Sequence, residues 1–162
     1  MPGLKGVRGP LKSDTVALQN FICTEPSSAL YDPHRGKHHP RQWELEVQSG
    51  IRRLKFPPHC GEVVRIAEVE TGDLAGICIA TPSENEHISI IQAIAVAVTY
   101  RRQGVGRLLL ASMLTELSTA AILARIHHRN DSSIRLFDEF GFEPAGHDKE
   151  EPALLNHLLL RD

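Results

Sequence analysis

The sequence predicts an α/β fold in which helices flank a mixed, mostly antiparallel sheet. Residues 62–70 alternate polar and apolar side chains, and residues 75–81 read as the returning strand of a hairpin. Residues 88–98 are apolar on both faces, as a central strand covered on both sides should be. A wide helical stripe over 104–117 and a short apolar strand over 121–127 follow. A strand, helix, strand order requires a parallel crossover.

The first 60 residues are the least regular part of the chain. Residues 16–23 suit a strand or a short helix, and we expect the strand. Residues 24–42 are dense in Pro, Gly and basic residues, which predicts a long basic loop. Trp43 begins an apolar series with helical spacing, which predicts a helix over about 40–54.

The last third repeats the strand and helix theme once. Asn130 or Asp131 can cap a helix whose aromatic face includes Phe137, and Gly141 stands where a left-handed residue would end it. Residues 142–147 and 153–160 then predict a closing pair of strands.

Length and charge limit the function classes. The chain has 162 residues, which suits a single domain over 1–162. Residues 1–60 hold nine basic and five acidic residues, whereas the remainder holds nine and fifteen. This imbalance argues against nucleic-acid binding, which requires a broadly basic surface.

Location and cysteine chemistry follow from the same composition. The longest nearly apolar stretch, 88–98, is about half the roughly 20 residues of a membrane helix, so we expect no membrane partner. The N-terminus lacks a secretory pattern, so we expect a cytoplasmic protein. Cys23, Cys60 and Cys78 show neither a disulfide pattern nor a zinc pattern and are interpreted as reduced thiols.

The turn between the central strand and the long helix carries the strongest chemical signal. Residues 101–107 read Arg-Arg-Gln-Gly-Val-Gly-Arg and open directly into a helix. The first N–H groups of a helix lack internal partners and carry partial positive charge, so a diphosphate can bind there. Gly106 would leave room for phosphate oxygens. Neither a Rossmann turn, which needs Gly where Leu109 stands, nor a Walker loop fits.

Segment 94–109 resembles the coenzyme A motif of the GNAT acyltransferase superfamily. That motif is Arg or Gln, two residues, Gly, one residue, then Gly or Ala, and it is matched by Arg101, Gly104 and Gly106. Segment 130–142 resembles the second signature of the family, an Asn, a short helix, an aromatic residue and a closing Gly-Phe. The resemblance covers about 62–160, so 61–162 is the expected coenzyme-binding core and 1–60 a variable N-terminal part.

The resemblance implies a fold, an activity and a set of binding residues. The GNAT-like sheet is splayed between strands four and five, where the pantetheine of acetyl-CoA lies like an added strand. An acetyl group passes from acetyl-CoA to a primary amine, on a small molecule or a protein, by direct attack in a ternary complex. The residues expected to bind the coenzyme are Ile94, Val96, Ala97, Val98, Arg101, Arg102, Gln103, Gly104, Val105, Gly106, Arg107, Asn130, Ser133 and Phe137.

The sequence departs from the family pattern at the catalytic positions. Many relatives have a tyrosine, able to protonate the leaving thiolate, where Phe137 stands. Many also carry a carboxylate or histidine on strand four, where this chain has Ile90 and Gln92. A base must then come from elsewhere. The candidates are Glu86, His87, His127 and His128.

Three alternatives stay open at this stage. The protein could bind coenzyme A without turnover, as a sensor or interaction module, or acylate a macromolecule docked on the basic loop. The fold is also compatible with a homodimer. No metal is expected, because Pro33, Gly36 and Pro40 prevent the helix that would align His34 and His38.

Overall fold

The computed structural model describes residues 3–24, 42–56, 58, 61–82 and 87–162. Its strands are β1 (Leu4–Arg8), β2 (Val63–Val69), β3 (Leu74–Pro82), β4 (Ile88–Val96), β5 (Ala121–His127), β6 (Glu143–His147) and β7 (Leu154–Leu160). Its helices are α1 (Asp14–Ala17), α3 (Gln42–Arg52), α4 (Val105–Glu116) and α5 (Asp131–Glu139), with short 3-10 turns η1 (Leu18–Asn20) and η3 (Val98–Tyr100).

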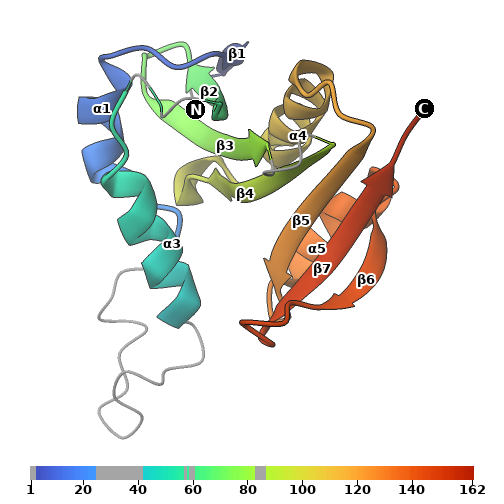
Figure 1. The fold of residues 1–162 in the computed structure, drawn as a ribbon. Helices are drawn as coiled ribbons and strands as arrows, with labels where there is room; N and C mark the ends of the chain where they lie inside the picture. Colours follow the sequence, from blue (N-terminus) through green and yellow to red (C-terminus); the bar gives the residue numbers. More distant parts are fainter. Residues whose placement is uncertain (1–2, 25–41, 57, 59–60, 83–86) are drawn as a thin grey trace, which may run out of the picture.

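In the described part of the chain, seven strands form one sheet in the order β1-β2-β3-β4-β5-β7-β6 (Figure 1). Neighbouring strands are antiparallel except β4 and β5, which are parallel. The α4 crossover joins this parallel pair, as the sequence order required. The predicted α/β class with a mostly antiparallel sheet is therefore confirmed. None of the described helices is long and apolar enough to cross a membrane.

The strand expected over residues 16–23 is wrong. This segment forms α1 and η1 instead, because Asp14 fixes the start of a helical turn. The Asp14 carboxylate is buried, accepts two hydrogen bonds from Arg8 at 2.8 and 3.0 Å, and accepts a third from the N–H of Leu11 at 2.7 Å. Val16 is 67% exposed while Leu18 is fully buried, so the segment covers the sheet with one helical side.

The first strand, β1, was missed by the sequence analysis. It pairs with β2 at the edge of the sheet, from Leu4 opposite Val69 to Arg8 opposite Ile66. Its sequence, Leu-Lys-Gly-Val-Arg, has no clear apolar alternation. An edge strand of this kind gains its order from pairing with β2, and that is a tertiary contact.

Two hydrophobic cores lie on the two faces of the sheet. One contains α4 and α5 residues, including Leu109, Met113 and Phe137, against β3 and β5. The other contains Leu18 and Ile51, from η1 and α3, against β2 and β3. The α3 helix and the α5 helix therefore cover opposite faces, which leaves the open face of β5 and β7 opposite α5 (Figure 1).

The α4 helix is closed at its C-terminal end by one arginine. The Arg161 guanidinium donates hydrogen bonds to the carbonyls of Leu114 at 2.6 Å, Thr119 at 3.1 Å and Leu117. These carbonyls lie at the negative end of the helix dipole, where a cation is stabilising. Arg161, which directly follows β7, thereby stabilises the C-terminal end of α4. The N-terminal end of α4 lies beside the opening between β4 and β5.

Candidate active site

The sheet opens between β4 and β5. Their parallel ladder runs from Ile88 opposite Ala121 to Ile91 opposite Ala124, although both strands continue beyond that point. The register of β3 against β4 shifts between Ile79 and Ala80, which leaves Gln92 as the extra residue of a β-bulge. The bulge bends β4 away from β5, as Figure 1 shows. The second half of β4 can therefore pair with an extended ligand that enters as an added strand.

The N-terminal end of α4 lies next to this opening, where the chain continues from β4. Gly104 is the N-cap residue, with φ of 79°, and its helix has no side-chain cap. The first-turn N–H groups of an uncapped helix are suited to an anion. Arg102 has φ of 62°, a left-handed conformation that is uncommon for a residue with a side chain. Such local strain is typical of ligand-binding loops.

Two of the three arginines in the loop have protein partners. Arg101 donates a hydrogen bond to the carbonyl of Cys23, and Arg107 forms an ion pair with Glu139 of α5 at 2.8 Å. These arginines therefore connect the loop to its surroundings. Arg102 is exposed and has no ion pair among the described residues. It is the arginine best placed to meet a diphosphate.

Gly106, at the start of α4, packs closely against α5 and β4. A Cβ at this position would lie 3.3 Å from Leu136 of α5 and 3.8 Å from Val96 of β4. The space beside Gly106 is therefore filled by neighbouring side chains, so its missing Cβ lets α5 approach α4.

The second sequence motif is placed at α5. Asn130 is the N-cap, and its Oδ1 accepts the N–H of Ser133 at 3.2 Å. Phe137 is 1% exposed and contacts Phe142 edge to face, with ring centroids 4.9 Å apart. Phe137 therefore belongs to the core between α5 and the sheet.

A second wall of the opening is formed by α3 and by residues 21–24. Gln48 Oε1 accepts the N–H groups of Cys23 at 2.8 Å and Thr24 at 3.2 Å. Thr24 also donates its hydroxyl hydrogen to Glu44 Oε2 at 2.6 Å, and Arg52 donates to the carbonyl of Phe21 at 2.8 Å. One polar stripe of α3 therefore holds residues 21–24, and the carbonyl of Cys23 in turn accepts a hydrogen bond from Arg101.

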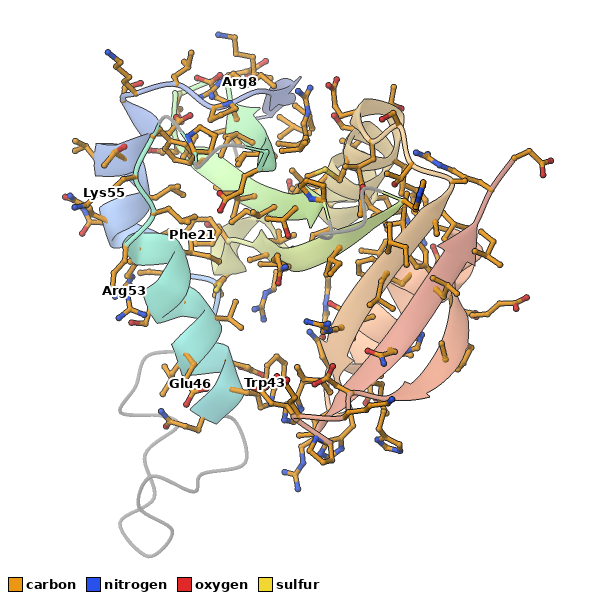
Figure 2. All side chains as sticks on the ribbon, in the orientation of Figure 1. Arg8, Phe21, Trp43, Glu46, Arg53 and Lys55 are labelled. Atoms are coloured by element: carbon orange, nitrogen blue, oxygen red, sulfur yellow. The ribbon has the colours of Figure 1, made fainter. Side chains whose placement is uncertain are left out.

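Trp43, at the start of α3, reaches across to the end of β5 (Figure 2). Its ring stacks on His127 with centroids 4.7 Å apart and planes at 8°. The His128 ring also stacks on His127, with ring centroids 4.7 Å apart. The sequence analysis assigned Trp43 only to a helical stripe, and no local pattern indicates that it meets β5.

His127 is less suited to act as a base than its position suggests. Its Nδ1 accepts the N–H of Arg129 at 3.2 Å, so the neutral ring carries its hydrogen on Nε2 and donates there. Burial, with the nearby charges of His128 and Arg129, lowers the pKa of His127. The ring is therefore neutral at pH 7 and is a hydrogen-bond donor at Nε2.

Of the remaining base candidates, His87 is separated from this region. His87 precedes Ile88, which pairs with the first residue of β5, whereas His127 is the last residue of that strand. A strand of seven residues spans about 20 Å, so His87 and His127 lie near opposite ends of β5. His128 is exposed beside His127, and Glu86 lies outside the described residues.

No described thiol or metal cluster supplies another route. Burial raises the pKa of the Cys78 thiol to about 12 and also raises that of Cys23, so neither is a thiolate nucleophile. Both are free cysteines. Within the described ranges, no group of three or more His, Cys, Asp or Glu side chains could hold a metal ion.

Comparison with known proteins identifies the family and the fold. A family profile described as "Acetyltransferase (GNAT) family" matches residues 23–142. A search of curated proteins found no match.

Solved structures are similar over most of the chain. An acetyltransferase of the GNAT family from Staphylococcus aureus has a TM-score of 0.67 at 14% identity, covering 97% of this chain and 99% of that one. The ribosomal-protein-S18-alanine N-acetyltransferase from Escherichia coli has a TM-score of 0.60 at 16% identity, covering 96% and 91%. A Bacillus anthracis protein described as a streptothricin acetyltransferase, in complex with acetyl coenzyme A, has a TM-score of 0.53 at 20% identity, covering 63% and 64%.

At these identities the structural likeness establishes the fold, and the profile match over most of the chain establishes the family. The parallel β4-β5 pair and the glycine turn before α4 lie inside the matched range. The chain belongs to the acetyltransferase (GNAT) family, which confirms the family and the enzyme class that its two motifs predicted.

Proposed function

We propose that this protein transfers an acetyl group from acetyl-CoA to a primary amine, by direct attack within one ternary complex. The observation that carries the proposal is the opening between β4 and β5 beside the uncapped start of α4. An extended pantetheine with a diphosphate at one end has the shape and charge for these two adjoining features.

The binding residues are assigned by their place around the opening. The diphosphate would accept backbone N–H groups at the start of α4, with Arg102 as the charged partner. Ile94 and Val96 would pair with the pantetheine through their backbone groups, because β4 has left the β5 ladder there. Arg101, Arg107 and Asn130 would act by holding the loop and α5 in position.

The chemistry requires the amine as a free base. Its nitrogen lone pair attacks the thioester carbonyl carbon and forms a tetrahedral intermediate with a negative oxygen. The C–S bond then breaks, its electron pair goes to sulfur, and the proton lost by nitrogen is passed to the thiolate or to water. Ordinary thiols ionise near pH 8.5, so a thiolate is an acceptable leaving group without an acid at Phe137.

The comparisons support this proposal at the level of the family. The Bacillus anthracis neighbour contains acetyl coenzyme A, and the Escherichia coli neighbour is an N-acetyltransferase of a ribosomal protein. Neither identifies the acceptor of this chain.

One observation favours a second candidate, a family member that binds coenzyme A without turnover. Phe137 is buried in the core and has no ionisable group, and neither β4 nor β5 carries a carboxylate. Binding would be retained in such a protein while amine-dependent release of free CoA would be absent.

The first experiment measures thermal unfolding with acetyl-CoA, CoA and ATP. A ligand at about 100 times its dissociation constant adds roughly 2.7 kcal/mol of stability, equivalent to several degrees for a chain of this size. We expect shifts with acetyl-CoA and CoA only. The absence of any shift would contradict the coenzyme site, and a shift without CoA release from an amine panel would favour the second candidate.

The Arg102→Glu variant tests the diphosphate assignment. It places a negative charge at the start of α4, so we expect it to abolish the acetyl-CoA shift. Arg53→Glu is the matched control, because Arg53 is an exposed arginine just after α3 (Figure 2). Equal acetyl-CoA shifts in both variants would refute the assignment.

A further inference from the structure

Two buried polar atoms near the opening have no hydrogen-bond partner among the described residues. They are Nε1 of Trp43, a donor, and Oδ1 of Asn156, an acceptor. An unpaired buried polar group is costly, so each such atom requires an explanation, and a bound partner that is absent from the structure is one. They come from α3 and β7, which are far apart in the sequence.

The strand register brings both atoms to one surface. Asn156 pairs with Arg125, and His127 is two residues further along the same face of β5. The alternate residues Ile122, Ala124 and Ile126 face the α5 core, so Asn156 and His127 share the opposite, open face. Trp43 stacks on His127 at this face. We call Trp43, His127 and Asn156 the acceptor wall.

The acceptor wall has a definite hydrogen-bonding pattern. The Trp43 indole and the His127 Nε2–H can only donate, so each requires an oxygen on the ligand. Asn156 Oδ1 can only accept, so it requires an N–H. An amine with a neighbouring carbonyl oxygen satisfies all three groups, whereas an alkylamine leaves both donors unpaired.

The absence of a carboxylate from β4 and β5 independently favours the same class. Neither β4 nor β5 contains a carboxylate, and Glu44 already accepts the Thr24 hydroxyl. A lysine-like amine with a pKa of about 10.4 has roughly one molecule in a thousand neutral at pH 7.5. An α-amino group beside a carbonyl, with a pKa of about 7.7–8.0, has roughly one in three.

We infer that the acceptor is an α-amino group beside a carbonyl oxygen, held by Trp43, His127 and Asn156. The inference rests on the proposed acetyl transfer. Both a free amino-acid amide and the N-terminal residue of a peptide have this chemistry. Trp43 acts as a specificity-determining residue, because its N–H distinguishes carbonyl-bearing amines from alkylamines.

The kinetic test compares L-alaninamide with isopropylamine, in which a methyl replaces the carboxamide. Trp43→Phe keeps an aromatic ring for stacking and removes only the N–H donor. We expect it to raise KM for L-alaninamide about tenfold, the loss of one hydrogen bond, and to change that for isopropylamine less than twofold. Comparing each amine between wild type and variant cancels the difference in amine pKa. An Ala-Gly peptide in parallel distinguishes peptide acceptors from free amides.

Val47→Ala is the matched control on α3, since Val47 is 38% exposed and lies outside the acceptor wall. It should leave both KM values unchanged. Asn156→Leu should raise KM for both amines, because it removes the partner of the nitrogen that they share. Equal effects of Trp43→Phe on the two amines, or no effect on either, would overturn the inference.

A binding measurement keeps the inference separate from the proposed function. Trp43 is the single tryptophan of the chain, so intrinsic fluorescence reports this position alone. With CoA present to form a dead-end complex, L-alaninamide should change the fluorescence saturably and isopropylamine should not. If neither amine changes it, the acceptor wall is wrong even where acetyl-CoA binds. If acetyl-CoA and CoA cause no thermal shift, the proposed function falls on its own test.

Discussion

Replacing His157 by leucine should stabilise the protein, and increasingly so as the pH falls. His157 lies on β7 with 4% of its surface exposed, and both ring nitrogens are buried without a hydrogen-bond partner in the described part of the chain. It faces the α5 side of the sheet, where Asp138 is the charged neighbour. A buried polar group left unsatisfied costs about 1–3 kcal/mol. Leucine fills a similar volume without polar atoms, so we expect a gain of about 1–3 kcal/mol at pH 7.5.

The pH dependence follows from proton binding in the two states. Burial lowers the pKa of folded His157, and the opposing effect of Asp138 is smaller. Below pH 6.5 the unfolded chain therefore binds a proton that the folded chain resists, so the wild type loses stability as the pH falls. The slope approaches about 1.4 kcal/mol per pH unit until the folded pKa is reached. The His157→Leu variant lacks this titrating group. The difference in its free energy of unfolding from the wild type should therefore increase from pH 7.5 to 5.5.

Urea unfolding of both proteins at pH 7.5, 6.5 and 5.5 measures this difference. His127, whose pKa is also lowered, is present in both proteins and cancels in the comparison. His157→Gln is the control, because it removes the titration and keeps a polar side chain. A leucine variant less stable than wild type at pH 7.5, or an advantage independent of pH, would refute the reasoning.

Two further substitutions test the packing that positions the site. Gly76→Ala should destabilise by about 1–3 kcal/mol in urea unfolding, because its Cβ would lie 2.7 Å from the Ala95 carbonyl and 2.8 Å from Leu109. Gly50→Ala, in α3 with nothing within 4 Å, should instead stabilise by about 0.5–1 kcal/mol, and the reverse order would contradict the α4 packing. Arg161→Met should cost about 1–3 kcal/mol by leaving the last carbonyls of α4 without their cation, whereas the exposed Arg53→Met should be neutral in the same assay. Equal stability of these two arginine variants would show that the α4 cap contributes nothing.

The strongest parts of the fold were predictable because their signals are local. The apolar run that became β4, the glycine turn, and the wide stripe of α4 each specify an element from neighbouring residues alone. The order of these elements requires a crossover, and the parallel β4-β5 pair follows from it. The two short motifs were sufficient to indicate the family because both lie within this local framework.

Other features depend on contacts between distant residues. Residues 14–20 are helical because Asp14 is tied to Arg8, and β1 is a strand because β2 pairs with it. The role of Gly106 depends on the approach of Leu136 from α5, which its position in a glycine motif does not reveal.

The sequence by itself determined the family, the glycine turn before α4 and the mixed sheet, because spacing and hydrophobic periodicity act along one segment. Only the tertiary structure decided which candidate residues meet. It separates His87 from His127 by the length of a strand, and it places Trp43 of α3 on His127 of β5. Such a site is assembled by strand register and helix packing, and these bring together residues between which the chain carries no local pattern.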